Sequence, residues 1–404
     1  MQRCWSGEVR KKYRIGVLCY GLTPATVDLL NRLVDRLDTK DLRLKAFPLV
    51  KKDISGLDIH FPYYPNQFTG RYWVIKGKVP DSWLLTVQPS TIFNLLIESD
   101  LIVLLGIQSI PAVISALLAR LMHKPVLPIN QTMPPAMERR RPWYIRWPKK
   151  LVLRMAQFHI VQSEASEQTL REVYGIRGDQ LVYAPFDGGG RFFKKLLEQY
   201  PLTDRDEIRA QFCTSRNAVV FTFVGTLIYL KGVDVLLEAF AKMSPLTSNS
   251  YLWIVGPDGK KGGQLTALRE QAQRLGILER TIFLGRKSME ELVAIYRASD
   301  VFVLPTRKDV WPKVLVEAAL VGLPLITTPA SGAAYTLVRD GVNGYVVPIN
   351  DADALARAML RLTDSQARIK MGERSREIVE EFIQPELEAD RIVETIVHLL
   401  KSRH

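Results

Sequence analysis

The chain has 404 residues, of which 47% are hydrophobic and 24% charged, and its formal net charge is +13. This composition excludes a disordered or fibrous chain, and the length predicts two domains rather than one core. The three cysteines (Cys4, Cys19 and Cys213) are far apart and odd in number. They therefore indicate neither a disulfide framework nor a metal site, and they fit a reducing cytosol.

In the first half of the chain, short apolar runs alternate with helical patterns. YRIGVLCYG, LRLKAFPLV, SDLIVLLG, KPVLPIN and FHIVQSE are typical of buried strands, and helices are expected near 25–37, 110–122 and 146–157. Strands that alternate with helices form parallel sheets, so residues 1–190 are predicted to be a Rossmann-like domain. The basic N-terminus reads as a lead-in to the first strand rather than as a signal peptide.

The most apolar segment, residues 101–122, is nearly long enough to span a bilayer. Polar and helix-breaking residues interrupt it at Gly106, Gln108, Ser109 and Pro111. We therefore expect a buried strand that leads into a helix, and not a transmembrane span.

Residues 185–215 contain a glycine triplet, prolines and many charges, and they are predicted to be an interdomain linker. A second alternation follows, with strands at AVVFTFVG, SYLWIVG, TIFLG, DVFVLP, PLITT and GYVVP and helices near 231–243, 264–275, 288–298 and 313–321. Residues 191–383 are thus predicted to form a second Rossmann-like domain, and helices are expected at about 351–382 and 386–401. The last of these, about 384–404, is expected to pack back on the first domain.

Ligands of open α/β sheets bind at the carboxyl ends of the strands, so the loops after these strands are candidate sites. In FTFVGTLIYLKG the strand ends at Gly225, and Lys231 comes directly before a helix. Free N–H groups at a helix start, together with an ammonium, favour an anion, although an exposed lysine on an ordinary turn fits the same pattern. The loops after Gly256 and around Arg286 are weaker candidates, and neither has a Walker signature.

The stretch KDVWPKVLVEAALVGLPLITT places two acids, Asp309 and Glu317, eight positions apart. If a helix begins near Lys313, the backbone N–H groups of Lys313, Val314 and Leu315 are unpaired and offer donors to an anion. Glu317 is flanked by apolar residues on this helix, and a buried carboxylate needs partners. We expect it to accept hydrogen bonds from the diol of a ligand.

The positive charge is concentrated in the first half: residues 1–200 hold 29 Lys and Arg against 17 Asp and Glu, whereas residues 201–404 hold 26 against 25. Its densest part is ERRRPWYIRWPKKLVLRMA, where basic and aromatic residues alternate. Anionic lipid attracts such a pattern, although a solvated basic helix also fits it; nucleic acid is disfavoured. The predicted membrane patch consists of Arg139, Arg140, Arg141, Trp143, Arg146, Trp147, Lys149 and Lys150.

Taken in order, FVG…KGVDVLLEAF, WIVGPDG, IFLGRKSMEELVAIYRASDVFVLPT, DVWPKVLVEAALVGLPLIT and LVRDGVNGYVVPINDADALARAM resemble retaining glycosyltransferases of family 4, within glycosyl transferases group 1. The resemblance is strong over about 220–382 and rests only on strand–helix rhythm before that. It implies the GT-B fold, with two Rossmann-like parallel-sheet domains that face a central cleft. It also implies a nucleotide-diphosphate-sugar donor, with UDP-sugar favoured, in the C-terminal domain and an acceptor in the N-terminal domain.

The resemblance also implies roles for individual residues. Glu317 matches the acid that binds the nucleotide ribose, and Lys231 matches the lysine that meets the diphosphate. Asp309 matches the acid that contacts the sugar, but the family usually has glutamate there. Thr226 replaces the usual arginine, so a charge contact is missing or comes from Arg307 or Lys313. The donor site expected on this basis comprises Gly21, Gly225, Thr226, Lys231, Gly256, Arg286, Asp309, Lys313, Val314, Leu315 and Glu317.

On the acceptor side, Asn130 and Gln131 occupy the position where the family often carries a histidine. No histidine is placed as a general base, which fits a family in which the leaving phosphate takes the acceptor proton. The D-x-D at Asp351 to Asp353 reads as a helix start, so neither a metal nor another cofactor is expected.

These observations predict a retaining, metal-independent hexosyltransferase acting on a lipid-linked or polysaccharide or glycoconjugate precursor. It is expected in the cytoplasm, peripheral at the inner face of the membrane. Two alternatives remain open: a non-hydrolysing nucleotide-sugar epimerase-like enzyme of GT-B fold, and a non-catalytic glycosyltransferase-like partner subunit. The departures at Thr226, Asp309 and Asn130 favour the second alternative, whereas the lack of well-placed histidines argues against the first.

Overall fold

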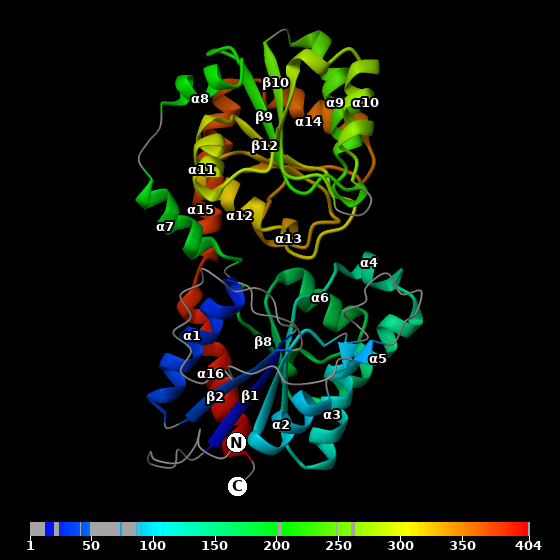
Figure 1. Cartoon of the computed structure of the whole chain (residues 1–404), viewed down its shortest axis with the longest axis vertical. Coiled ribbons are helices and arrows are strands. Elements are labelled where there is room, and N and C mark those ends of the chain that lie inside the picture. Colours follow the sequence, from blue (N-terminus) through cyan, green and yellow to red (C-terminus); the bar gives the residue numbers. More distant parts are fainter. Residues whose placement is uncertain are drawn as a thin grey trace.

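The computed structural model shows two α/β units, one above the other in Figure 1, each built on a six-stranded sheet. The residues that it describes are 13–19, 24–40, 42–48, 73–74, 86–87, 89–107, 109–186, 188–200, 204–247, 249–259 and 263–402. Every strand pairing within the two sheets is parallel. The fold class expected from the alternating pattern is therefore confirmed.

The N-terminal sheet consists of apolar strands, most of whose side chains are buried. In sheet order they are β2 (Leu42–Pro48), β1 (Tyr13–Cys19), β5 (Leu101–Leu105), β6 (Val126–Asn130), β7 (His159–Val161) and β8 (Leu181–Tyr183). The two short strands β3 (Trp73–Val74) and β4 (Thr86–Val87) form a separate antiparallel pair. Burial on both faces explains why these strands read as continuous apolar runs.

Helices cover both faces of this sheet. α1 (Pro24–Asp38) and α16 (Pro385–Lys401) pack together on one face and share a core with β1. The other face holds α2 (Pro89–Glu98), α3 (Ile110–Leu121), α5 (Trp143–Met155) and α6 (Glu164–Glu172), with α4 (Pro135–Arg139) beside α6. Glu388 anchors α16, because it accepts hydrogen bonds from Arg32 (2.9 Å) and from Gln162 (2.7 Å).

The C-terminal sheet repeats this arrangement with a larger core. In sheet order its strands are β11 (Thr281–Gly285), β10 (Ser250–Val255), β9 (Val219–Val224), β12 (Val301–Leu304), β13 (Leu325–Thr327) and β14 (Gly344–Val346). Phe221, Phe223, Trp253 and Phe302 are fully buried within it. Aromatic and β-branched side chains suit such a doubly covered sheet.

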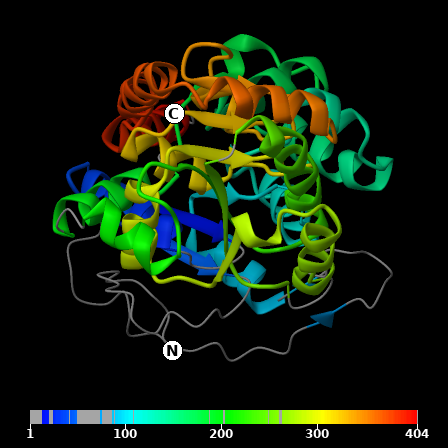
Figure 2. The same ribbon diagram turned by 90° about the horizontal axis from the view of Figure 1, so that it is seen from above.

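Helices also flank the strands of this second unit, as the view from above shows (Figure 2). One group is α9 (Val233–Met243), α10 (Leu265–Arg274) and α14 (Ala352–Arg361); the other is α8 (Arg205–Gln211), α11 (Met289–Ala298), α12 (Lys313–Val321) and α15 (Ser365–Phe382), with the short α13 (Ala334–Leu337) against α15. Local signals explain several ends: Ser288 and Glu291 form a capping box at α11, and Gly322 ends α12 in a left-handed conformation.

The prediction of a plain linker over 185–215 is wrong, because this segment contains two helices. α7 (Gly190–Gln199) buries Phe193 against Tyr296, with ring centroids 5.8 Å apart, and α8 packs on α11. The helices were not predicted because charged residues and a glycine triplet interrupt the pattern of apolar residues that they pack against the C-terminal core.

The apolar segment 101–122 divides into β5 and the 12-residue helix α3, as its polar interruptions predicted. In the part of the chain that the structure describes, no helix combines the length and the apolar character needed to cross a bilayer.

Candidate functional site

Three strand ends of the C-terminal sheet approach one another closely. The N–H of Gly225 donates to Val255 O (2.9 Å), and the N–H of Gly256 donates to Gly285 O (2.8 Å). A Cβ atom on Gly256 would lie 2.0 Å from the carbonyl oxygen of Gly225, so no larger residue fits there. Arg286 follows Gly285, the last residue of β11, and its side chain is exposed. Gly225, Gly256 and Arg286 thus lie at one edge of the sheet.

The loop after β9 brings Lys231 to the same edge. It ends in a 3₁₀ turn, Tyr229–Lys231, followed by Gly232 with φ +71°. A Cβ atom on Gly232 would lie 2.1 Å from the carbonyl oxygen of Pro305, which follows β12. This glycine therefore lets the start of α9 approach the end of β12.

Lys231 and Asp309 form an ion pair, although they are 78 residues apart. The backbone holds Asp309 in place: its N–H donates to Ala330 O (3.0 Å), and its carbonyl accepts from Gly332 N–H (2.9 Å). The structure thus brings together two residues that the sequence had marked separately.

Glu317 lies in the second turn of α12 and is partly buried. Its Oε2 accepts a hydrogen bond of 2.8 Å from the hydroxyl of Tyr296, a fully buried residue of α11. Burial raises the pKa of Glu317, and the Tyr296 hydrogen bond and the charge of Lys313 offset that shift only in part. Sequence reasoning missed Tyr296, although the rule that a buried carboxylate needs a partner pointed to some donor.

The start of α12 differs in one respect from the prediction. The N–H of Leu315 donates to Pro312 O (3.1 Å), so the prediction that it is unpaired is wrong: the first turn is tight enough to satisfy it. Lys313 and Val314 open the helix as expected, and among the described residues no side chain caps it. The helix start therefore remains a candidate anion site.

Arg307, one of the two residues suggested in place of the arginine that Thr226 replaces, has partners within the chain. Its guanidinium binds both carboxylate oxygens of Asp234 (2.7 and 2.6 Å), and it lies 3.9 Å from the ring centroid of Tyr229. Thr226 lies in the loop after β9, where its carbonyl accepts from Ile228 N–H (2.9 Å). A contact of Arg307 with the diphosphate would have to form beside this ion pair with Asp234, and it stays a prediction.

The two predicted acceptor-side residues, Asn130 and Gln131, differ in burial. Asn130 is buried at the end of β6, and its amide donates to Pro128 O and Ile160 O (both 3.3 Å). Its side chain thus links β6 to β7, because the amide reaches a backbone carbonyl of each strand. Gln131 is exposed. Gly21 lies outside the described residues.

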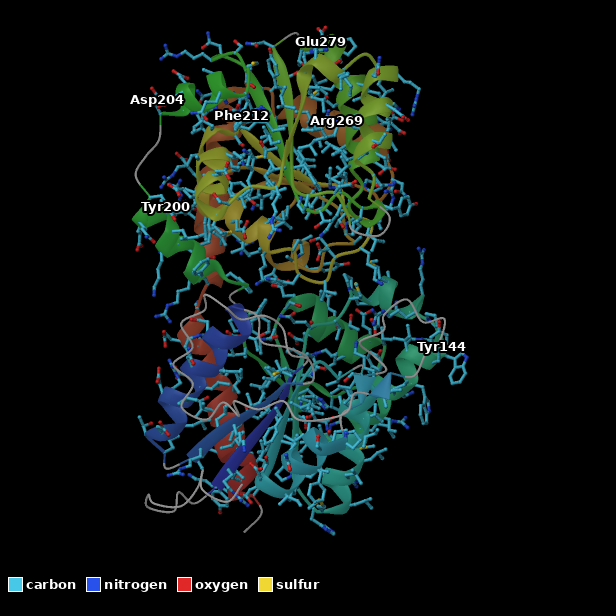
Figure 3. All side chains as sticks on the ribbon, in the orientation of Figure 1. Tyr144, Tyr200, Asp204, Phe212, Arg269 and Glu279 are labelled. Carbon is cyan, nitrogen blue, oxygen red and sulfur yellow. The ribbon has the colours of Figure 1, made fainter. Side chains whose placement is uncertain are left out.

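The basic and aromatic segment forms α4, α5 and the turn between them. Trp143 and Trp147 are 72% and 60% exposed, and Tyr144 points away from the body of the protein at the right edge of Figure 3. The basic side chains differ in exposure: Arg139, Arg140 and Lys150 are exposed, whereas Arg141 and Arg146 are partly buried. Arg139 pairs with Glu172 (2.9 Å).

Lys149 does not belong to this exposed patch, so its inclusion in the prediction is wrong. Its side chain is 2% exposed, and its ammonium donates to Glu138 Oε1 (2.9 Å), which also accepts from the hydroxyl of Tyr174 (2.5 Å). Arg141 Nε lies 3.8 Å from the other oxygen of Glu138. These contacts hold the pKa of Glu138 below its ordinary value, against the opposing effect of burial. Lys149 therefore fastens α5 to α4.

The D-x-D acids at 351 and 353 have structural partners. Asp351 accepts from Ala354 N–H (2.8 Å) and caps α14, and Asp353 pairs with Lys242 (2.6 Å). Within the described ranges, no group of three or more His, Cys, Asp or Glu side chains is arranged to hold a metal ion.

Known proteins resemble the C-terminal part of the chain in sequence. The family model for glycosyl transferases group 1 matches residues 204–378. A D-inositol 3-phosphate glycosyltransferase of Rhodococcus opacus (strain B4) is 34% identical over 176 residues, which are 43% of this chain and 39% of that protein. The chain thus matches about two fifths of the length of this relative.

Solved structures resemble the fold over nearly the whole chain. A glycosyltransferase from Rickettsia africae ESF-5 has a TM-score of 0.71 and 16% identity, with 96% of this chain and 99% of that chain covered. Anabaena Alr3699/HepE, solved in complex with UDP, has a TM-score of 0.71 and 19% identity, with 96% and 100% covered. Residues 204–378 therefore match the glycosyl transferases group 1 family, and the chain as a whole has the GT-B fold.

Proposed function

We propose that the protein is a retaining glycosyltransferase that binds a nucleotide-diphosphate sugar at the edge of its C-terminal sheet. One observation carries the proposal: Lys231, in the loop after β9, pairs with Asp309, in the loop after β12, and that second loop leads into α12, which carries Glu317. A cation, a helix start and two carboxylates suit the diphosphate, the sugar and the ribose of such a donor.

Each group has a part in the proposed reaction. The Lys231 ammonium and the N–H groups at the start of α12 stabilise the negative charge that develops on the departing diphosphate. Glu317 uses the oxygen that Tyr296 does not occupy to accept from the ribose hydroxyls, and Asp309 accepts from the sugar. The leaving phosphate takes the acceptor proton on the same face as the acceptor attacks, so no separate general base is needed, and Lys231 stabilises the diphosphate charge in place of a metal ion.

A UDP-sugar is the favoured donor. Anabaena HepE, of the same fold, was solved in complex with UDP, and the Rhodococcus relative is named for transfer to an inositol phosphate. For the acceptor we propose a lipid-linked or polysaccharide or glycoconjugate precursor at the cytosolic membrane face, approached through the N-terminal domain.

The membrane part of the proposal rests on the surface of α5. Trp143, Tyr144 and Trp147 are exposed at its first turns, and Lys150 and Arg154 are exposed further along the helix. The neighbouring α3 exposes Leu121 to 74%. Aromatic anchors beside basic side chains favour the interface of an anionic bilayer.

Donor turnover tests the catalytic part. The purified protein is incubated with UDP-, GDP- or ADP-sugars and with a lipid-extract or saccharide acceptor, and release of the nucleoside diphosphate is measured. We expect release from one donor, a product that keeps the anomeric configuration of the donor, and full activity in the presence of a metal chelator. Nucleotide binding without turnover would instead favour a non-catalytic subunit, and sugar isomerisation without an acceptor would favour an epimerase.

Flotation with vesicles tests the membrane part. We expect the wild type to float with vesicles that contain phosphatidylglycerol, and the triple variant Trp143→Ser, Trp147→Ser, Lys150→Glu to stay at the bottom of the gradient. A matched control is Leu246→Ser, Ile369→Ser, Lys370→Glu, which alters exposed residues of the C-terminal domain and is expected to float. Equal flotation of all three proteins would show that the exposed residues of α5 do not bind the membrane.

A further inference from the structure

The cation of the proposed diphosphate site already has an anionic partner within the chain. Lys231 donates to Asp309, and their side chains are only 22% and 16% exposed. In such a partly buried place, charges interact more strongly than at an open surface. An incoming diphosphate that uses Lys231 therefore competes with Asp309.

The backbone fixes this pairing, so it is part of the fold rather than a chance surface contact. The carbonyl of Leu230 accepts hydrogen bonds from the N–H of Arg307 and from the hydroxyl of Thr306, both 2.8 Å long. These bonds tie the turn that carries Lys231 to the loop after β12. The backbone hydrogen bonds of Asp309 to Ala330 and Gly332 hold the other partner of the ion pair in place.

Arg307, which lies two residues before Asp309, does not relieve the competition. Arg307 is bound to both oxygens of Asp234 and to the side chain of Asn350 (2.6 Å). When a diphosphate takes Lys231, Asp309 is left as a carboxylate beside a new anion, and an unpaired, partly buried charge is unfavourable.

We propose that Asp309 makes the site select an intact nucleotide-diphosphate sugar over the free nucleoside diphosphate. This inference rests on the proposed function. A sugar presents hydroxyl groups that donate to the displaced carboxylate, whereas a free nucleoside diphosphate presents only more negative charge. The internal carboxylate therefore weakens binding of the free nucleotide and promotes its release after transfer.

Calorimetry on three variants tests this selection. Asp309→Asn removes the charge with little change in shape, Asp309→Glu keeps the charge, and Asp353→Asn breaks the exposed Lys242–Asp353 pair as a matched control. Each protein is titrated with UDP and with UDP-glucose, or with the GDP and ADP counterparts if the wild type prefers those. Circular dichroism checks that each variant is folded.

We expect Asp309→Asn to bind the free diphosphate about 10-fold more tightly than the wild type, a change of about 1.4 kcal/mol. Its affinity for the sugar nucleotide is expected to change less, so the preference for the intact donor shrinks. Asp309→Glu and Asp353→Asn are expected to bind the free diphosphate as the wild type does.

Two results would overturn the inference, and they differ in meaning. If the wild type binds the free diphosphate and Asp309→Asn binds it equally or more weakly, Asp309 is not a competitor, and the proposed function stands. If neither protein binds any of the three nucleotides or their sugars, the proposed function fails and the inference fails with it.

Discussion

Replacing Glu317 with alanine is expected to lower kcat/KM for the sugar nucleotide by about 100-fold, largely through a higher KM. A hydrogen bond to a charged group contributes about 1.5–3 kcal/mol, and the carboxylate is proposed to accept from both ribose hydroxyls. The change also leaves the buried hydroxyl of Tyr296 without its acceptor. Steady-state kinetics with the preferred donor measures the loss, and an unchanged KM would remove Glu317 from the ribose site.

The variant Tyr296→Phe keeps the carboxylate of Glu317 but removes the hydrogen bond that it accepts from the Tyr296 hydroxyl. The Tyr296 hydrogen bond lowers the pKa of Glu317, whereas burial raises it. Without the hydroxyl the pKa rises further, so the carboxylate takes up a proton at a higher pH. We therefore expect the acid limb of the kcat/KM profile to move to higher pH in Tyr296→Phe. Tyr174→Phe removes a hydroxyl that donates to Glu138 in the other domain, and it is expected to leave the profile unchanged.

Replacing Lys149 with methionine is expected to reduce the free energy of unfolding by about 3–5 kcal/mol. The substitution leaves the carboxylate of Glu138 buried without its ammonium partner, and breaking a buried pair from one side costs about this much. Urea denaturation followed by circular dichroism measures the change.

The neighbouring Lys150→Met is the control for this prediction. Lys150 is on the same helix and is exposed, so its replacement is expected to change stability by no more than about 0.5 kcal/mol. If Lys149→Met were as mild as the control, the buried contact with Glu138 would not be what holds α5 to α4.

The order of strands and helices was predictable because its signals are local. The capping box of Ser288 and Glu291 and the glycine after α12 mark helix ends within a few residues. Apolar runs marked every strand of both sheets except β8, whose three residues are too short a run to stand out. The two helices within residues 185–215 were not predicted, because their apolar faces are short and are interrupted by charged residues.

The contacts of the candidate site required the tertiary structure. The hydrogen bond between Tyr296 and Glu317 depends on how α11 packs beside α12, and the pair of Lys231 and Asp309 depends on how two loops meet. Lys149 shows the opposite error, since a basic residue in a segment that resembles a membrane patch was assigned to a surface that it does not reach. Residue type and spacing gave the candidates but not the direction of their side chains.

Titration of the wild type with UDP, GDP and ADP in a calorimeter tests the central claim, that the edge of the C-terminal sheet binds a nucleoside diphosphate through Lys231. The account predicts saturable one-to-one binding of at least one nucleotide, strongly weakened by Lys231→Met and unchanged by Lys242→Met, whose lysine pairs with Asp353 on the same domain. Absence of binding by all three nucleotides at millimolar concentration, or full binding by Lys231→Met, would contradict it.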